Sequence, residues 1–549
     1  MFSSCIEALW VFLTMSLRVS VMLAVFLRLL DTRGSGIGAS DVQKRADQPA
    51  SHSRCCHNEQ GTPASYIAAV YEHDTYLLQD PHRVMNRSGA LDLMRKNLQV
   101  FADQASAASK QGAQIIVFPE DGIYGMGYTR DSIFPFLEEI PDPVMHPWNP
   151  CLLPHRHHHT EVLHILSCIA RNNSLVVVAN MGDKQDCSKD VDPHCPDDCH
   201  YQFNTDVVFE TDGQFIAKYH KYNLFYENQF DSPPRCEHVT FTVFSVTFGM
   251  FTCFDILFKD PSVEVVEKLG VKNVVFPTAW GNALPLRHAV QYHQAWAMGE
   301  NVNLLSANQH HPFFDMTGSG IYSGQSGALV YYHDSDWSSG GKLLVAVVPT
   351  DPGCSNDENF CNKITEYEKK DYPEQDNNYN TISKVSVEGR PFRNLTARTF
   401  QSKIEEDIYT FSPLENGTGH VEVCDNALCC QLDYSMSLKE GELYAFGAFD
   451  GLHTFQGQYY LQVCVLLKCQ SDTHPSCGRS ITSAGTSFSL LHMAGNFSTS
   501  YVYPEVSTDR VSLAPPSEWK FEAQAITSTK GISKPLLSAG LYGRWYDRD

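Results

Sequence analysis

Short apolar runs alternate with longer amphipathic stretches from residue 65 to about residue 348. Residues 91–110 and 161–171 carry apolar side chains three and four positions apart, the spacing of a helix with one buried face. Each is followed closely by an apolar run of strand length, at 115–118 and 174–180. Further strands are predicted at 65–71, 207–209, 214–217, 247–252, 273–276 and 303–306, and further helices at 261–269 and 286–299. This alternation predicts a layered α/β domain.

The pattern changes after residue 349, where Asp, Asn, Glu, Lys and Pro predominate and apolar periodicity is lost. Short β-type runs separated by turns then appear at 419–424, 442–446, 458–466 and 500–503. We therefore expect an α/β domain at 64–349, a linker or insert at 350–400, and a mostly β domain at 401–549. Residues 41–63 have few large apolar side chains and are predicted to be a flexible segment.

The first 40 residues are largely apolar, interrupted by Arg18 and Arg28. We interpret them as a signal peptide or hydrophobic leader, with cleavage within residues 34–40. The alternative is an uncleaved anchor over residues 8–30, in which both arginines would lie at costly depths. Residues 543–549 form no hydrophobic tail, so no lipid-anchor signal is expected at the C-terminus.

Composition narrows the class of protein. The formal net charge of −22 argues against a nucleic-acid or anionic-membrane partner and favours a small molecule or a protein. Eighteen cysteines favour the secretory route, where disulfides persist. Glycosylation sequons support a secreted glycoprotein and occur at Asn86, Asn172, Asn394, Asn416 and Asn496. Six cysteines are predicted to staple the β domain, in pairs left open: Cys424, Cys429, Cys430, Cys464, Cys469 and Cys477.

Three predicted strands end on chemically reactive side chains, namely Glu120, Lys221 and Cys253. Because ligands of open α/β sheets bind at strand ends, we expect these side chains to converge on one cleft. A thiolate at Cys253 could attack an amide, with Glu120 as base and then acid. Lys221 and the backbone N–H of Phe254 are the expected donors to the oxyanion. This chemistry requires no metal and no organic cofactor.

The alternative for Cys253 is half of a disulfide, the more common state of a cysteine in a secreted protein. We predict instead that Cys253 is the one unpaired cysteine of the eighteen.

The surrounding residues resemble the nitrilase (carbon-nitrogen hydrolase) superfamily. Phe118-Pro-Glu120, Tyr219-His-Lys221 and Phe251-Thr-Cys253 are similar to its Glu, Lys and Cys motifs, specifically those of its biotinidase and vanin (pantetheinase) branch. The resemblance spans residues 66–549 and includes 276–280, 316–321 and 449–454. It implies an α-β-β-α sandwich, a Glu120/Lys221/Cys253 triad and hydrolysis of a linear amide. Glu227 stands where the superfamily often has a supporting second glutamate, although a surface charge is the alternative.

The resemblance leaves the substrate open. Segments 148–156, 160–163 and 307–312, with the polar C-terminus, resemble biotinidase and imply release of biotin from biocytin and biotinyl peptides. Segments 168–174, 227–230 and 295–299 resemble vanin and imply hydrolysis of pantetheine. We favour the first, and a non-catalytic secreted binding protein is a third hypothesis. Two residues depart from the family pattern. Cys199 stands where the family usually has a glycine, and Gly281 stands where it usually has a bulkier residue. They leave the disulfide pairing and the pocket shape in doubt.

Two stretches are rich in histidine and cysteine, the residue types that commonly bind metal ions. His155-Arg-His-His-His159 is predicted to be a solvated loop, because adjacent histidines rarely all reach one ion. Cys187, His194, Cys195, Cys199 and His200 offer varied ligands, but the secretory context favours disulfides, with a structural zinc as the alternative. We therefore predict no bound metal. The oligomeric state is not readable from the sequence.

Overall fold

The computed structural model describes residues 64–353, 399–528 and 530–549. The predicted leader, the flexible segment, the sequon at Asn394 and nearly all of the predicted linker therefore lie outside the described residues. Within the described residues, none of the helices is both long enough and apolar enough to cross a membrane.

The first sheet of the α/β domain has six strands in the order β12-β1-β2-β3-β4-β5. Their bounds are β1 Ser65–Glu72, β2 Ile115–Val117, β3 Val176–Asp186, β4 His200–Phe209, β5 Phe215–His220 and β12 Lys342–Pro349. Strands β1, β2 and β3 run parallel, and the remaining neighbours pair antiparallel. Parallel neighbours require crossover connections, and the two helices predicted from apolar spacing provide them.

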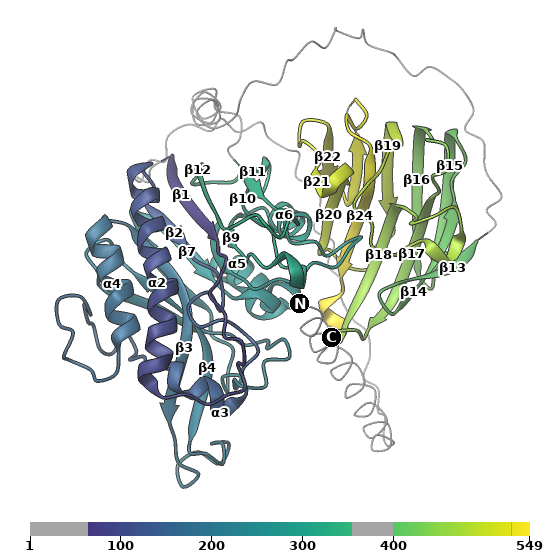
Figure 1. The fold of residues 1–549 in the computed structure, drawn as a ribbon. Helices are drawn as coiled ribbons and strands as arrows, with labels where there is room; N and C mark the ends of the chain where they lie inside the picture. Colours follow the sequence, from purple (N-terminus) through teal and green to yellow (C-terminus); the bar gives the residue numbers. More distant parts are fainter. Residues whose placement is uncertain (1–63, 354–398, 529) are drawn as a thin grey trace. The chain divides into compact units, whose positions relative to one another are not determined.

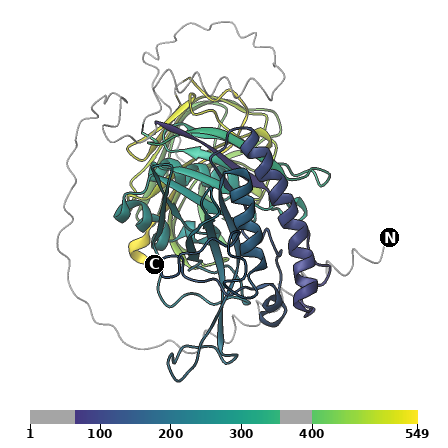
Figure 2. The same ribbon diagram turned by 90° about the vertical axis from the view of Figure 1, so that its left-hand side faces the viewer.

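Helices α2 (Arg87–Lys110) and α4 (Glu161–Asn173) lie side by side over one face of this sheet (Figures 1 and 2). Helix α2 begins where the Asn86 side chain accepts a hydrogen bond from the Gly89 N–H at 2.9 Å, a typical N-cap. Its buried stripe includes Met94, Leu98 and Phe101, which face the sheet at four- and three-residue spacing. The predicted helix over residues 91–110 is thus present, and its apolar residues form the buried face.

The second sheet also has six strands, in the order β11-β10-β9-β8-β7-β6. Their bounds are β6 Val239–Val243, β7 Val246–Met250, β8 Asn273–Pro277, β9 Asn303–Ala307, β10 Ser319–Ser323 and β11 Gly327–Tyr332. Helices α5 (Glu264–Leu269) and α6 (Ala289–Glu300) pack against this sheet. The first sheet contacts the second through β1, β2 and β3 and also through β12 and β5.

Strand β2 shows how the layers arise from the sequence. Ile115 and Val117 join the core between the two sheets, whereas Ile116 joins the core under α2 and α4. A strand buried on both faces needs a continuous apolar run, because successive side chains point to opposite faces. The predicted α-β-β-α sandwich is therefore confirmed.

The predicted mostly β domain is also confirmed, and it contains two antiparallel sheets. One sheet is formed by β13 Phe400–Ile404, β14 Asp407–Pro413, β17 Tyr444–His453, β18 Tyr459–Lys468, β20 Val502–Thr508, β21 Ser512–Leu513 and β24 Leu536–Arg544. The other is formed by β15 Gly417–Asp425, β16 Leu428–Ser437, β19 Ser487–Gly495, β22 Trp519–Glu522 and β23 Ala525–Ser528. Its six cysteines pair as Cys424–Cys429, Cys430–Cys464 and Cys469–Cys477.

The prediction that only Cys253 is unpaired is wrong. Among the described cysteines, Cys199 and Cys236 are also outside any disulfide. In the α/β domain the bridges are Cys151–Cys168 and Cys187–Cys195. Cysteine spacing alone cannot assign pairs, because a bridge requires Cα atoms within about 7 Å whatever their separation in sequence.

Arg544, at the end of β24, joins the β domain to the α/β domain. Its guanidinium is buried and lies over the rings of Tyr459 and Tyr546, at 4.5 and 4.6 Å from their centroids. Its Nε donates a hydrogen bond of 2.7 Å to the carbonyl of Leu257. Leu257 ends the short 3-10 turn that begins at Cys253, so the β domain directly braces a segment of the candidate site.

Candidate active site

Glu120 lies three residues after β2 and is almost fully buried. Its Oε1 accepts hydrogen bonds from Lys221 Nζ at 2.6 Å and from Asn204 Nδ2 at 2.8 Å. Its Oε2 accepts one from the backbone N–H of Ala279 at 2.9 Å. Three donors fix both oxygens, so the carboxylate is held in one orientation.

Lys221 directly follows β5, and only 1% of its surface is exposed. Its ammonium is paired with Glu120 and also with Glu227. Burial alone would lower the pKa of Lys221, but the two carboxylates outweigh burial and raise its pKa well above the usual value. Lys221 therefore stays cationic and can donate hydrogen bonds within the site.

Cys253 follows β7 and begins a short 3-10 turn, Cys253–Leu257. Its φ of 48° lies in the left-handed region, which a residue with a side chain occupies only when its surroundings enforce it. Asp255 supplies that enforcement: it accepts hydrogen bonds from Thr252 N at 3.1 Å, Tyr219 hydroxyl at 2.7 Å and Asn223 N at 2.8 Å. The strand end is thus bent so that the thiol is presented at a fixed position.

The thiol of Cys253 is buried and shares its electrostatic environment with the other two residues. Burial is the main reason that its pKa lies well above the usual value, and the charge of Glu120 adds to the effect. Lys221, the Thr278 hydroxyl and the Ala279 N–H act in the opposite direction. The resting thiol is therefore protonated, and its activation requires a base at hand.

The structure places the side chains of Glu120 and Lys221 in direct contact, and the Cys253 thiol lies close enough for both charges to act on it. Sequence reasoning missed the polar residues that connect them, chiefly Asn204 in the middle of β4. Asn204 Nδ2 also donates to Glu227 at 3.1 Å, and its Oδ1 accepts from Asn180 at 2.6 Å. The available signal was the Asn-Thr-Asp run directly before the apolar Val-Val-Phe end of the strand, because buried polar side chains must be hydrogen-bonded.

Asp206 extends this buried network beneath the thiol-bearing turn. It accepts hydrogen bonds from Asn180 Nδ2 at 2.9 Å and from the Thr252 hydroxyl at 2.7 Å. Burial raises the pKa of Asp206 to about 8, and the charges of Glu120 and Asp255 add to the effect. Burial likewise raises the pKa of Asp255 to about 6.

The side chain of Phe254, the residue after Cys253, is buried. It packs against Phe225 and Phe258, with ring centroids 5.1 Å away in each case. A Cβ on Gly457, in the turn between β17 and β18, would lie only 2.9 Å from the Phe254 ring. The β domain therefore approaches the site closely, which no local sequence pattern could indicate.

Of the two departures from the family pattern, Gly281 is exposed, and a Cβ there would meet no heavy atom within 4 Å. A bulkier side chain would consequently fit, and its absence leaves open space beside Trp280. Cys199 is also exposed. The four described sequon residues are all exposed or partly exposed, namely Asn86, Asn172, Asn416 and Asn496. Their glycosylation stays a prediction.

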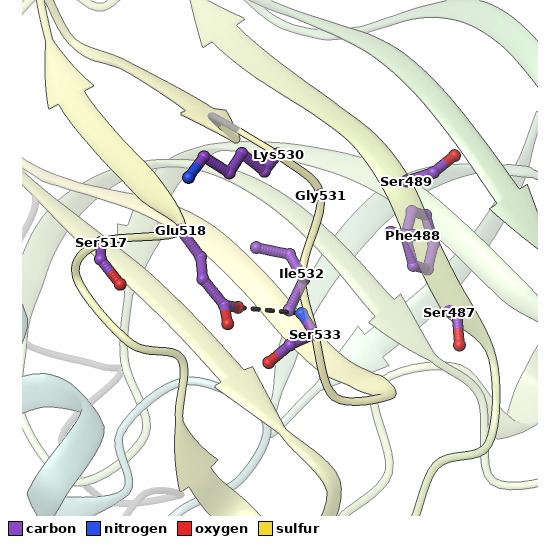
Figure 3. A pocket seen from close by; sticks show the side chains of 9 residues that line it. All are labelled: Ser487, Phe488, Ser489, Ser517, Glu518, Lys530, Gly531, Ile532 and Ser533. Carbon is purple, nitrogen blue, oxygen red and sulfur yellow. Dashed lines mark hydrogen bonds between the residues drawn. The ribbon is translucent and has the colours of Figure 1, made fainter. Parts of the chain in front are cut away.

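A cavity of about 500 Å³ lies in the β domain, apart from the triad (Figure 3). Its walls include Phe488, Glu518 and Lys530, and the Glu518 carboxylate accepts a hydrogen bond from Ser533 N at 2.9 Å. None of the three strand-end residues lines it. Glu120, Lys221 and Cys253 all belong to the α/β sandwich, so this cavity is separate from them.

Comparison with known families agrees with this fold. The carbon-nitrogen hydrolase model matches residues 79–296, and the Vanin C-terminal domain model matches residues 398–549. The chain therefore belongs to the carbon-nitrogen hydrolases, and it is a hydrolase that acts on amides.

Relatives define the branch more closely. Biotinidase of Bos taurus is 43% identical over 89% of this chain and 95% of its own, and pantetheinase of Mus musculus is 45% identical over 91% and 93%. The chain thus belongs to the biotinidase and pantetheinase branch. Among solved structures, an amidase from Nesterenkonia sp. covers 56% of this chain and 97% of its own at 18% identity and a TM-score of 0.37, too distant a likeness to carry an argument.

Proposed function

We propose that the protein is a secreted thiol amidohydrolase in which Cys253 is the nucleophile, Glu120 the proton acceptor and donor, and Lys221 the oxyanion stabiliser. The observation that carries this assignment is the placement of a buried Glu120, fixed by Lys221 and Ala279, beside a buried thiol that needs a base. The five disulfides among the described residues support an extracellular location.

In the proposed cycle, Glu120 takes the thiol proton as the sulfur of Cys253 attacks the amide carbon. The negative charge that develops on the carbonyl oxygen is stabilised by the ammonium of Lys221 and the backbone N–H of Phe254. Glu120 then gives its proton to the departing amine, and a thioester remains on Cys253. Water attacks this thioester with Glu120 again as base, which releases the acid and restores the thiol.

The proposed substrate is a biotinyl amide, with biotin released from biocytin or biotinyl peptides. The segment at 307–312, which resembles biotinidase, reaches the site: Gln309 Nε2 donates to the backbone carbonyl of Glu120 at 2.5 Å. Within the same segment, Asn308 binds both the N–H and the carbonyl of Trp280. The segment that resembles biotinidase therefore contacts the backbone of the proposed base, which supports a biotinyl substrate.

Pantetheine is the second candidate, in which the pantothenoyl group is transferred to Cys253 as cysteamine departs, and water then releases pantothenate. Its support is the segment at 227–230, which resembles vanin and also reaches the site through the contact of Glu227 with Lys221. Glu227 thus supports the triad, and its pKa is raised by burial and by Glu120 although Lys221 opposes the shift.

The test is hydrolysis of biocytin and of pantetheine by the purified protein, with intact-mass analysis of the quenched reaction. We expect a mass increase equal to one biotinyl group on the wild type and none on Cys253→Ala, whose turnover falls at least about 10³-fold. A pantothenoyl adduct instead would establish the second candidate. Inactivity on both amides, with the Cys253 thiol shown to be free, would leave a binding protein as the explanation.

A further inference from the structure

A second cluster of reactive side chains lies outside the triad, at Cys236, His238 and Asp260. The sulfur, an imidazole nitrogen and a carboxylate oxygen of these residues all lie within 4.8 Å of one another. The His238 Nε2 and the Asp260 Oδ1 are 2.5 Å apart. Cys236 is not in a disulfide in the structure, so its sulfur is available to the cluster.

The extended conformation of residues 236–238 explains why the side chains of Cys236 and His238 lie on the same side of the chain. Cys236 and His238 stand two positions apart directly before β6, and both face Asp260. Glu237, between them, faces the other way and contacts the ring of His220 at 3.2 Å and its backbone N–H at 3.2 Å. This alternation is that of an extended chain, and the anchored Glu237 keeps its two neighbours turned toward Asp260.

The backbone of Asp260 is held in place by a hydrogen bond from Asn223. Asn223 Nδ2 donates to the Asp260 carbonyl at 3.0 Å and to the Asp255 carboxylate at 2.9 Å. The carboxylate of Asp260 is itself half exposed, and the side chain of His238 is 30% exposed. The main chain at the cluster is therefore fixed, whereas the ligand atoms can adjust and remain open to solvent.

We propose that Cys236, His238 and Asp260 form a binding site for a divalent cation of the zinc type, with solvent as the fourth ligand. Thiolate, imidazole and carboxylate are the three side-chain ligands that zinc takes in proteins, and a site with three protein ligands keeps one open position. Magnesium and calcium prefer oxygen ligands alone, so the sulfur and nitrogen select for zinc and its first-row neighbours.

Binding requires a small rearrangement. In a tetrahedral zinc site the nitrogen and oxygen ligands are roughly 3.4 Å apart, so His238 and Asp260 must separate by about 1 Å and lose the proton that they share. The thiol of Cys236 also releases its proton to solvent as the sulfur–metal bond forms. The exposed side chains allow both changes without moving the backbone that Asn223 and Glu237 hold.

The site also lies close to the catalytic turn. Asn223 connects the backbone of Asp260 to Asp255, which enforces the left-handed conformation of Cys253. A bound cation would therefore tie the start of β6 to the segment that follows the catalytic turn. This consequence does not depend on which amide the enzyme cleaves.

The experiment uses the purified full chain, stripped of metal and titrated with Co²⁺ as a spectroscopic probe. Binding at the site produces a near-ultraviolet thiolate-to-cobalt charge-transfer band and tetrahedral visible bands at one equivalent. We expect the charge-transfer band and the tetrahedral visible bands to disappear in Cys236→Ser. In His238→Ala we expect the affinity for Co²⁺ to fall at least about tenfold. Competition by Zn²⁺ should abolish the cobalt bands, while excess Mg²⁺ should not.

Matched controls exclude other metal-binding groups of the chain. Cys199→Ser removes a different free cysteine, which is exposed, and His420→Ala removes a histidine that bonds Asp433 at 2.7 Å without a cysteine partner. Both should retain the bands. The proposal is overturned if the charge-transfer band persists in Cys236→Ser, if it is lost only in Cys253→Ala, or if peptide mapping of the non-reduced protein finds Cys236 in a disulfide. Absence of any thiolate–cobalt band in the wild type would overturn it equally.

Discussion

The ammonium of Lys221 lies 2.6 Å from the carboxylate of Glu120, although 101 positions separate the two residues in the sequence. Each residue follows a strand of the same sheet, β5 and β2, and the sheet brings the two strand ends to one edge. This ion pair is almost entirely shielded from water. Its charge balance therefore governs both the chemistry and the stability of the site.

Replacement of Glu120 by Gln should remove the base while keeping the shape of the side chain. We expect kcat to fall about 10²- to 10⁴-fold, which is the usual contribution of a positioned acid or base. Glu227→Gln is the matched control, because Glu227 also contacts Lys221, and its kcat should fall much less. Steady-state kinetics of both variants provide the measurement, and equal losses would contradict the assignment of Glu120 as the base.

Replacement of Lys221 by Met should impair both activity and folding. The variant leaves Glu120 and Glu227 facing each other without a cation, and breaking a buried ion pair on one side costs about 3–5 kcal/mol of unfolding free energy. Adding Glu227→Gln to Lys221→Met should recover part of that stability but none of the activity. Chemical denaturation and amide-hydrolysis rates, measured on the same preparations, separate these effects. If Lys221→Met is inactive but as stable as the wild type, the ion pair does not contribute to stability.

Asp206→Asn should alter how stability depends on pH. Burial raises the pKa of Asp206 in the folded protein to about 8, whereas an unfolded carboxyl titrates near 3.9. Between these values the folded state holds a proton that the unfolded state has lost, so the free energy of unfolding decreases as pH rises. Without this carboxyl, the decrease from about pH 5 to about pH 8 should be shallower. Denaturation midpoints at several pH values provide the test, and parallel profiles would contradict it.

Gly281→Val should change substrate affinity without loss of stability. A Cβ at position 281 meets open space, so we expect the free energy of unfolding to change by under about 0.5 kcal/mol. The added methyl groups occupy space beside Trp280, so KM should rise more for a bulky acyl group than for a small one. Gly249→Val is the control: its Cβ would lie 2.4 Å from Val265 Cγ1 and should destabilise the fold. An unchanged KM for every amide would show that position 281 lies away from bound substrate.

The sequence singled out Glu120, Lys221 and Cys253 because each follows closely on a predicted strand, which is a local signal. Strand β10 was missed because its Ser, Gly and Tyr residues resemble the composition of a turn. Asn204 was missed for another reason: its importance depends on three partners that lie 23 to 84 residues away. Strand register decides such contacts, and one sequence does not specify register between distant strands.

The hydrogen bond from Arg544 to the Leu257 carbonyl spans 287 positions of the chain. During synthesis, the strands that carry Glu120, Lys221 and Cys253 leave the ribosome long before residue 544 does. Co-translational folding can therefore assemble the sandwich early, but it cannot complete the support of the thiol-bearing turn at that stage. The site is therefore completed only after residue 544 has left the ribosome. A prematurely terminated polypeptide would lack the Arg544 hydrogen bond while retaining every reactive group.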